Sequence, residues 1–200
     1  MTRRLVLATR NADKVTELLR ILDEAGLDVD LVGVDAFDHV PDVAETGSTF
    51  AENALLKARA AATATQLPAI ADDSGLCVDV LGGMPGVFSA RWAGVHGDDA
   101  ANLSLVLAQL ADVSEERRGA HFACAAAFAT PGGVEHVVEG SLAGRLIRDP
   151  RGANGFGYDP VFVPEGQTRT TAEMSSKEKD AISHRGEAFR ALVELLRGLD

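Results

Sequence analysis

Short apolar runs alternate along this sequence with segments whose apolar residues recur at helical spacing. Residues 4–8 (RLVLA) have the length of a buried strand. The segment that follows carries four apolar residues at the i, i+3, i+4, i+7 spacing of an amphipathic helix: Val15, Leu18, Leu19 and Leu22. Asn11 stands where the N-cap of that helix belongs, and Gly26 follows its expected end. A strand that leads directly into a helix is typical of α/β proteins, in which helices cover the faces of a sheet.

The same alternation continues through the rest of the chain. Residues 30–34 predict a second strand, and residues 69–72 predict a third. Between them, Thr49 and Glu52 have the spacing of a capping box that opens an Ala-rich helix through about Ala64. Two further helices are indicated by apolar residues at helical spacing: Leu103, Val106, Leu107 and Leu110, and then Phe189, Leu192, Val193 and Leu196.

A hairpin is expected in the second half of the chain. Residues 121–130 and 134–140 predict two strands around the turn Pro131-Gly132-Gly133, so part of the sheet is antiparallel. No low-complexity linker or internal repeat interrupts the 200 residues. We therefore expect a single domain over residues 1–200 of the α/β class, with a mixed β-sheet flanked by helices.

The charge balance restricts the partners. The chain has 30 acidic and 19 basic residues, which gives a formal net charge of −11. Binding to the nucleic-acid backbone needs a basic stripe, so we expect no nucleic-acid partner. A small polyanion such as a nucleotide stays possible where a few Lys, Arg and backbone N–H groups converge and a divalent cation joins them.

The apolar runs and the cysteines indicate a cytoplasmic protein. The apolar run near the start is too short for a signal peptide, and no run approaches the length of a membrane span, so we expect no membrane partner. Cys77 and Cys124 are far apart in sequence and lie in apolar surroundings. We expect two buried free thiols and no cysteine metal site.

Two adjacent aspartates, Asp72 and Asp73, follow an apolar run at the point where we expect a strand to end. Adjacent carboxylates repel each other and are costly near a protein interior unless a cation lies against them. An Asx-type turn before Ser74-Gly75 explains one aspartate but not two. In open α/β sheets ligands bind beyond the carboxyl ends of strands, where carboxylates commonly hold Mg²⁺. The pair therefore predicts a site for a divalent cation.

Two further segments near helix starts carry polar residues that packing does not require. Residues 9–14 (TRNADK) could cradle phosphates with helix N-terminal amides, a hydroxyl and a lysine, although they lack the P-loop pattern. A capped helix with a solvated lysine would also explain them. In residues 45–57 the capping box accounts for Glu52 but leaves three residues without an explanation: Glu45, Asn53 and Lys57. Asn53 and Lys57 are four apart, so they lie on one helix face, which is either functional or solvated.

The last polar segments lie near the C-terminal helix. Phe156 stands between glycines in residues 152–160 (GANGFGYDP), where its ring suits stacking on a flat ligand. Lys179, His184 and Arg185 come just before the last apolar stripe. A capping box from Ser175 to Glu178 with surface charges around it is the alternative for this segment.

Six segments occur in order across nearly the whole chain: LATRNADK, ETGSTFAENALLKA, ADDSGL, LGGMPG with FSARW, GFGYDPVF and EKDAISHRG. Together they make the sequence similar to the inosine triphosphate pyrophosphatase family, whose members hydrolyse deaminated purine nucleoside triphosphates. The resemblance implies an α/β fold with a long mixed β-sheet flanked by helices and two lobes with the active cleft between them. It also implies Mg²⁺ as cofactor, a homodimer, and hydrolysis of ITP, dITP and XTP to the nucleoside monophosphate and pyrophosphate.

The resemblance also implies a role for each matched residue. It implies contacts to the triphosphate from Thr9, Arg10, Asn11, Ala12, Asp13, Lys14 and Lys57. Asp73 corresponds to the proton acceptor, Ser74 to a substrate contact, and the metal ligands are expected to be Glu45, Asp73 and Asp72. The base is expected to contact Phe156, Gly157, Tyr158 and Asp159, with Lys179, His184 and Arg185 closing over it. Ala44 departs from the family pattern, in which some relatives carry a second acidic residue.

Base selection follows from donors and acceptors. Donors from His184 or Arg185 would favour the oxygen at C6 of hypoxanthine or xanthine over the amino group of adenine. One alternative is a septum-inhibitor-like pyrophosphatase acting on modified pyrimidine nucleotides, against which the SHR segment and the GFGYDP turn argue. Another is a non-catalytic nucleotide-binding regulator, against which the retention of both Glu45 and Asp73 argues.

Overall fold

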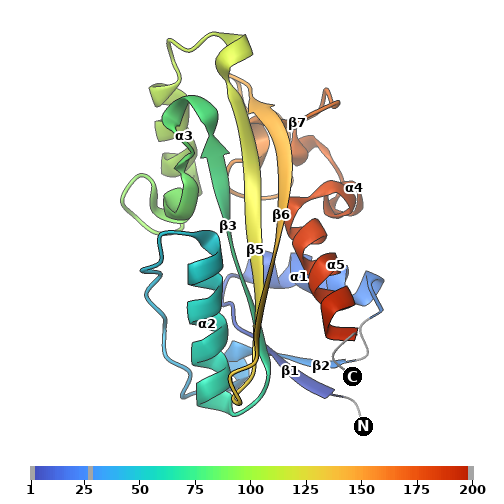
Figure 1. Ribbon diagram of the computed structural model, residues 1–200. Helices are drawn as coiled ribbons and strands as arrows, with labels where there is room; N and C mark the ends of the chain where they lie inside the picture. Colours follow the sequence, from blue (N-terminus) through green and yellow to red (C-terminus); the bar gives the residue numbers. More distant parts are fainter. Residues whose placement is uncertain (1–2, 27–28, 198–200) are drawn as a thin grey trace. The chain divides into compact units, whose positions relative to one another are not determined.

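A computed structural model describes residues 3–26 and 29–197 and confirms the mixed α/β class (Figure 1). The strands are β1 (Arg3–Leu7), β2 (Val29–Gly33), β3 (Ala69–Val78), β4 (Met84–Pro85), β5 (Gly119–Ala129), β6 (Glu135–Leu146) and β7 (Phe162–Pro164). The helices are α1 (Ala12–Glu24), α2 (Phe50–Thr65), α3 (Asp99–Gln109), α4 (Ser176–Ile182) and α5 (His184–Arg197).

The strands form one mixed sheet in the order β2-β1-β3-β5-β6-β7, with β4 paired to β3. β1 is parallel to β2 and to β3, whereas β4 runs antiparallel to β3 and β7 antiparallel to β6. The predicted hairpin is present, because Thr130 N donates to Val134 O at 2.9 Å across the turn between β5 and β6. A mixed sheet that contains an antiparallel hairpin is what the sequence predicts.

The chain divides into two compact units. The first contains residues 1–73, 124–140 and 185–200, and the second contains residues 74–123 and 141–184. Strands β3, β5 and β6 each contribute residues to both units. The active cleft implied by the resemblance stays a prediction.

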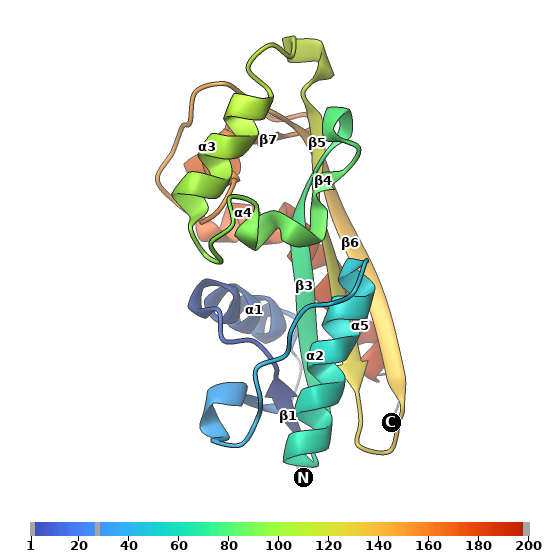
Figure 2. The ribbon, with the colours of Figure 1, turned by 90° about the vertical axis from the view of Figure 1, so that its left-hand side faces the viewer.

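In the first unit the sheet separates two apolar clusters, because successive side chains of a strand point to opposite faces. On one face Leu5, Leu7 and Ile70 pack with residues of α1 and α5. On the other face Val6 and Ala69 pack with the alanines of α2, such as Ala58. Figures 1 and 2 both show α2 lying along β3 in this unit. The small alanine side chains let the backbone of α2 approach the sheet closely.

Helix α1 buries a slightly different stripe from the predicted one. Leu18 and Leu22 are buried as expected, and Ile21 and Glu17 complete the buried face. Leu19, in contrast, is 46% exposed, so its predicted place in the stripe is wrong. Successive residues of a helix are rotated by about 100°, so the centre of the buried face lies between residue 18 and residues 21–22. Residue 19 then lies at the margin of that face.

Strand β3 does not end at the two aspartates. It runs for ten residues, and the aspartates therefore lie in the middle of a buried strand; the expectation that they mark a strand end is wrong. Ser74-Gly75 continues the strand because the absence of a side chain at Gly75 admits Gly86 O and the hydroxyl of Ser89. Ser89 Oγ in turn accepts from Leu76 N at 2.9 Å. The Ser-Gly dipeptide commonly forms turns, but in this strand it allows residues 86 and 89 to pack closely against β3.

The second unit has its own core and a buried arginine. Its apolar cluster includes Leu76, Val106 and Phe162 from β3, α3 and β7. Arg118 is buried and donates to Leu110 O at 2.8 Å and to Leu146 O at 2.9 Å. The guanidinium thus ties the residue after α3 to the end of β6.

Two smaller expectations concern the cysteines and the membrane. Cys77 and Cys124 are both buried and free, as predicted, and burial raises the pKa of the Cys124 thiol. Within residues 3–26 and 29–197, none of the helices combines the length and the apolar character that a membrane span requires. The cytoplasmic location stays a prediction.

The packing around Gly75 predicts a loss of stability in Gly75→Ala. A Cβ there would contact backbone and side-chain atoms of residues 86 and 89 too closely, so we expect the free energy of unfolding to fall by about 1–3 kcal/mol. Gly132→Ala is the matched control, because its Cβ would find Thr130 Oγ1 as its nearest neighbour at 3.8 Å. Urea unfolding of both variants measures the difference, and equal stabilities would contradict this account of Gly75.

Candidate active site

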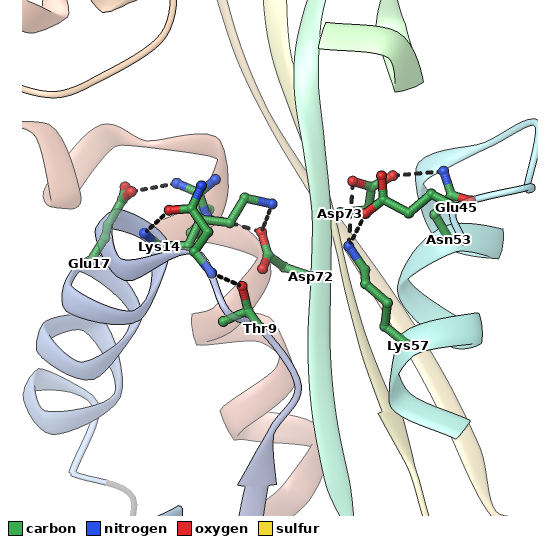
Figure 3. A network of polar contacts seen from close by, with 10 residues as sticks. Thr9, Lys14, Glu17, Glu45, Asn53, Lys57, Asp72 and Asp73 are labelled. Carbon is green, nitrogen blue, oxygen red and sulfur yellow. Dashed lines mark hydrogen bonds and ion pairs between the residues drawn. The ribbon is translucent and has the colours of Figure 1, made fainter. Parts of the chain in front are cut away.

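Asp72 and Asp73 point to opposite faces of β3 in the first unit (Figure 3). Both carboxylates are buried, and alternation along the strand turns Asp72 toward α1 and Asp73 toward α2. Adjacent in sequence, the two groups are therefore held by different sets of cations. Each face has to be considered separately.

On the Asp73 face, the carboxylate forms a cluster with Lys57, Asn53 and, through Lys57, Glu45. Lys57 Nζ lies 2.7 Å from Glu45 Oε1 and 3.7 Å from Asp73 Oδ1, so one ammonium serves two carboxylates. Asn53, one turn earlier on α2, donates from Nδ2 to Asp73 Oδ2 at 3.0 Å. Asn53 is fully buried and the Lys57 side chain is 15% exposed. This face of α2 is therefore turned toward the carboxylates, and the alternative of a solvated face is wrong.

The charges on this face influence one another. Burial raises the pKa of Asp73, Lys57 and Lys14 oppose that increase, and Glu45 adds to it. Burial alone would lower the pKa of Lys57, but Asp73, Asp72 and Glu45 outweigh it and hold the pKa above its ordinary value. Lys57 is thus an ammonium with Asp73 and Glu45 as its partners.

The Asp73 face has the chemistry of a site for a hard divalent cation. Glu45 and Asp73 offer carboxylate oxygens to a common positive charge, and Mg²⁺ prefers such ligands. Among the residues that the structure describes, no group of three or more His, Cys, Asp or Glu side chains is placed to hold a metal. Two protein carboxylates completed by phosphate oxygens and water are a common arrangement for Mg²⁺. The residues fit a divalent metal whose remaining ligands are water or phosphate oxygens.

Asp72 is not placed to be the third ligand that the sequence predicts. Its side chain lies on the face of β3 opposite to Asp73, where Lys14 Nζ approaches it at 3.1 Å. The same oxygen accepts from Arg185 Nε at 3.2 Å. Because alternation along a strand separates the two neighbours, Asp72 belongs to another network and we leave it out of the proposed ligand set.

That second network contains two cations and two carboxylates. Arg185 at the start of α5 donates to Asp72 and, through Nη1, to Glu17 of α1. Burial opposes ionisation of Asp72, but Lys14, Arg185 and Lys57 outweigh it and hold the pKa of that carboxyl well below its ordinary value of 3.8. Glu17 and Arg185 are themselves buried, so the charges balance in a region of low dielectric.

Glu17 is a residue that the sequence analysis missed, and Arg185 has an unexpected position. A glutamate on the buried face of an amphipathic helix, beside Leu18 and Ile21, was the available signal. The Arg185 side chain is 2% exposed and at least two of its nitrogens donate to carboxylates. Its predicted contact with a base stays a prediction, and such a contact would have to compete with these ion pairs.

Residues 9–14 form the capped start of α1. Thr9 Oγ1 accepts from Asn11 N at 3.3 Å, and Asn11 Oδ1 accepts from Lys14 N at 3.0 Å, which confirms Asn11 as the N-cap. Lys14 turns toward Asp72, so it is not the solvated lysine of the alternative interpretation. Ala12 and Asp13 are exposed in the first turn.

Arg10 has partners outside residues 9–14. It donates to Val40 O at 2.7 Å and forms ion pairs with Asp35 and Asp42. The structure thus ties Arg10 to the segment that follows β2, whereas Lys14 contacts the central strand. Its predicted contact with a triphosphate stays a prediction.

In the second unit, Asp159 organises the turn at residues 156–159. Its Oδ2 accepts from Phe156 N at 2.9 Å and from Lys179 Nζ at 2.6 Å, and its Oδ1 accepts from Thr171 Oγ1 at 2.7 Å. A side chain at Gly155, where φ is +73°, would collide with this carboxylate. The glycine-rich turn is therefore fixed by a buried carboxylate.

Three more of the residues predicted to bind the base pack around this turn: Gly157, Tyr158 and Lys179. Lys179 Nζ lies 5.0 Å from the centre of the Phe156 ring, Gly157 N donates to Asp99 at 2.8 Å, and Tyr158 Oη donates to Ser89 O at 2.8 Å. Ser175 and Glu178 do form the capping box of the alternative interpretation, yet Lys179 is buried against Asp159 and is not a surface charge.

His184 and Ser74 complete the positions predicted from the sequence. The ring of His184 stacks on Phe122 with centroids 4.9 Å apart. Ser74 follows Asp73 directly in β3 and is half-buried. The contacts that the two side chains were expected to make with substrate stay predictions.

Comparison with known proteins decides the family. The chain matches the sequence model of the Ham1 family over residues 5–195. It belongs to the Ham1 family. Two relatives named dITP/XTP pyrophosphatase, from Streptomyces coelicolor and Streptomyces avermitilis, are 69% and 70% identical over 196 residues, which is 98% of this chain and 98% of each relative. The resemblance inferred from the six segments is thereby confirmed.

Solved structures agree with this assignment. A crystal structure of a nucleoside-triphosphatase / dITP/XTP pyrophosphatase from Mycobacterium abscessus is 53% identical, has a TM-score of 0.79, and covers 96% of this chain and 99% of its own. A HAM1 protein from Coxiella burnetii is 42% identical with a TM-score of 0.89, covering 98% of this chain and 100% of its own. The α/β fold of this Ham1 family member is therefore shared with them.

The Asp72 network predicts a large stability loss in Asp72→Asn. The change leaves Lys14 and Arg185 with one buried carboxylate fewer, so we expect the free energy of unfolding at pH 7 to fall by about 3–5 kcal/mol. Because the folded-state pKa of Asp72 is lowered, its stabilisation is fully present above the ordinary value of 3.8 and is lost as pH falls below it. Urea unfolding at pH 7, 5 and 3 should show the difference from the wild type shrinking only at pH 3.

Asp149→Asn is the control for that measurement, because it removes the same charge from an exposed position. We expect it to change the free energy of unfolding by less than about 0.5 kcal/mol. An Asp72→Asn protein as stable as this control at pH 7 would contradict the network.

Proposed function

We propose that this chain hydrolyses dITP, ITP and XTP to the nucleoside monophosphate and pyrophosphate. The observation that carries the proposal is the Glu45, Lys57 and Asp73 cluster, found in a chain that is 69–70% identical to proteins named dITP/XTP pyrophosphatase. Two carboxylates that share one cation can hold a divalent metal. The activity assigned to these relatives uses a polyanionic substrate, which such a metal would accompany.

The proposed reaction begins with water attacking the α-phosphorus. The bond from the α-phosphorus to the bridging oxygen of the β-phosphate breaks, and pyrophosphate leaves with that oxygen. The water proton goes to Asp73, which is suited to be the base because burial raises its pKa toward the working range of a general base. Asp73 carries the proton until it passes to solvent.

The proposed reaction also requires that the negative charge of the phosphates be neutralised. Lys57 and Lys14 are ammonium groups on the two sides of β3, and both would stabilise negative charge on the transferring group and the leaving group. The first turn of α1 would offer the backbone N–H groups of Ala12 and Asp13 to a phosphate, because those of Asn11 and Lys14 already donate to side chains. Glu45 and Asp73 would hold Mg²⁺, which supplies Lewis acidity to the phosphoryl oxygens when it is bound.

The turn at residues 156–159 is proposed to bind the base. Asp159 fixes the backbone at Phe156, and the Lys179 ammonium lies over the Phe156 ring. An aromatic ring on a fixed backbone provides a stacking surface for a purine. The contacts that separate an oxygen from an amino group at C6 are proposed to come from His184 or Arg185.

The two alternatives receive less support. Two relatives, each matched over 98% of its length, are named for purine nucleotides. These names disfavour a septum-inhibitor-like enzyme for modified pyrimidines. A regulator without turnover would not need a buried proton acceptor such as Asp73 beside a second carboxylate, Glu45. We also propose a homodimer, on the strength of the family resemblance, and no nucleic-acid partner, because the net charge is −11.

Products of the reaction test the proposal directly. We expect incubation with ITP and Mg²⁺ to release IMP and pyrophosphate in equal amounts, because water attacks the α-phosphorus. Anion-exchange chromatography separates the products, and excess EDTA should stop their formation. Release of IDP and phosphate would refute attack at the α-phosphorus.

The role of Asp73 is tested by Asp73→Asn. The change preserves size but removes both the charge and the basicity, so we expect kcat for ITP to fall by roughly 100-fold or more. Circular dichroism should show an intact fold. Asp112→Asn removes the same charge from an exposed position and should keep the wild-type rate. A normal kcat in Asp73→Asn would exclude this carboxylate from the mechanism.

A further inference from the structure

Asn53 uses both ends of its amide inside the Asp73 face. Its Oδ1 accepts from Gly47 N at 2.7 Å, and its Nδ2 donates to Asp73 Oδ2 at 3.0 Å. The side chain is fully buried on the first turns of α2. Because one neighbour is a donor and the other an acceptor, the amide has a single orientation that satisfies both.

The segment before α2 is fixed against the same residue. A Cβ at Gly47 would lie 2.6 Å from Glu52 Cβ and 2.7 Å from Asn53 Oδ1, so the backbone is as close as a glycine allows. Ser48 donates from N and Oγ to Glu52 Oε2 at 2.6 and 2.8 Å. Glu45 lies two residues before Gly47, and its carboxylate contacts Lys57. Fixing residues 47–48 on the helix therefore limits where Glu45 can lie.

We propose that Asn53 is a positioning residue that sets the orientation of the Asp73 carboxylate and the place of the Glu45 segment. The proposal rests on the proposed function for the roles of Glu45 and Asp73. With Oδ2 held by the Asn53 amide, Oδ1 of Asp73 is directed to the side of Lys57. Figure 3 shows Asn53, Glu45 and Lys57 grouped around Asp73 on this face of β3.

An amide is well suited to this task. A neutral donor orients a buried carboxylate without adding a charge, whereas a further cation would compete with a metal for it. An aspartate at position 53 could still accept from Gly47 N, but it would present an oxygen to Asp73 Oδ2 and repel it. An aliphatic side chain would satisfy neither partner and would leave the partly buried N–H of Gly47 without an acceptor from residue 53. The two kinds of substitution thus separate the two contacts.

Steady-state kinetics with ITP test the proposal. We expect kcat to fall by about 10- to 100-fold in both Asn53→Asp and Asn53→Ala, the range for residues that orient a reacting or ligating group, with KM for ITP within about threefold of wild type. The loss in Asn53→Asp is decisive, because this variant retains an acceptor for Gly47 N. A kcat within about twofold of wild type in Asn53→Asp would overturn the proposal.

Ala61→Gly is the matched control for helix stability. Ala61 is buried on the same helix two turns further on, and glycine weakens a helix interior without touching the polar cluster. We expect its kcat to equal that of the wild type at a temperature where both proteins are folded. An equal loss of kcat in Ala61→Gly and Asn53→Ala would show that Asn53 acts only through stability and would overturn the proposal.

A second readout does not depend on turnover. Titration of the nucleotide-free protein with Mn²⁺, followed by the electron paramagnetic resonance signal of the free ion, measures metal binding alone. We expect Asn53→Ala to weaken Mn²⁺ binding by about 10-fold relative to both the wild type and Ala61→Gly. Unchanged Mn²⁺ binding would overturn the positioning of Glu45 and Asp73, whereas a wild-type protein that binds Mn²⁺ but leaves ITP intact would refute the proposed function alone.

Should both Asn53 variants fail to fold, Gly47→Ala provides the test from the other side of the contact. Its Cβ would displace residues 47–48 from Asn53 and leave the amide itself intact. We expect the same loss of kcat and of Mn²⁺ affinity. A folded Gly47→Ala protein with wild-type values of both would overturn the proposal.

Discussion

Two neighbouring carboxylates in the middle of a buried strand are the constraint on which the first unit depends. Neither Asp72 nor Asp73 can be buried as an anion without a cation against it. Because β3 turns consecutive side chains to opposite faces, one cation cannot serve both at close range. Lys14 and Arg185 approach Asp72, and Lys57 approaches Asp73. The placement of α1, α2 and α5 around β3 meets this requirement.

The two cations that approach Asp72 stand at the beginnings of their helices. Lys14 is the third residue of α1 and Arg185 is the second of α5. A cation in the first turn lies at the unfavourable, positive end of the helix dipole unless an anion joins it. Asp72 supplies that anion for both, and Glu17 adds a second for Arg185. The same positive ends would favour a phosphate, which connects the stability of the unit to the substrate class proposed for it.

Local patterns predicted the elements and their caps, and they failed where the partner is distant in sequence. Asn11 and Thr49 were predicted as caps, and Ser175 was the cap in the alternative interpretation of its segment, because capping is decided within four residues. The partners of Arg185 are 113 and 168 positions away, and no local pattern reports such a contact. Residues 72–75 were misjudged for a related reason. A run of Asp, Asp, Ser and Gly is typical of a turn, and only the cations and Ser89 that surround it allow it to continue as a strand.

The charged side chains around β3 differ in how far solvent reaches them. Arg185 and Asp72 have side chains that are 2% and 0% exposed, whereas Lys57 and Glu45 are 15% and 20% exposed. A group that is closed off on all sides can anchor a neighbour but cannot exchange a ligand. Asp72 therefore anchors Lys14, whose side chain is as exposed as that of Lys57. The groups proposed to meet a nucleotide or its metal around β3 are then Lys14, Lys57, Glu45 and Asp73, whose side chains are 7–20% exposed, and the fully buried Asp72 holds Lys14 in place.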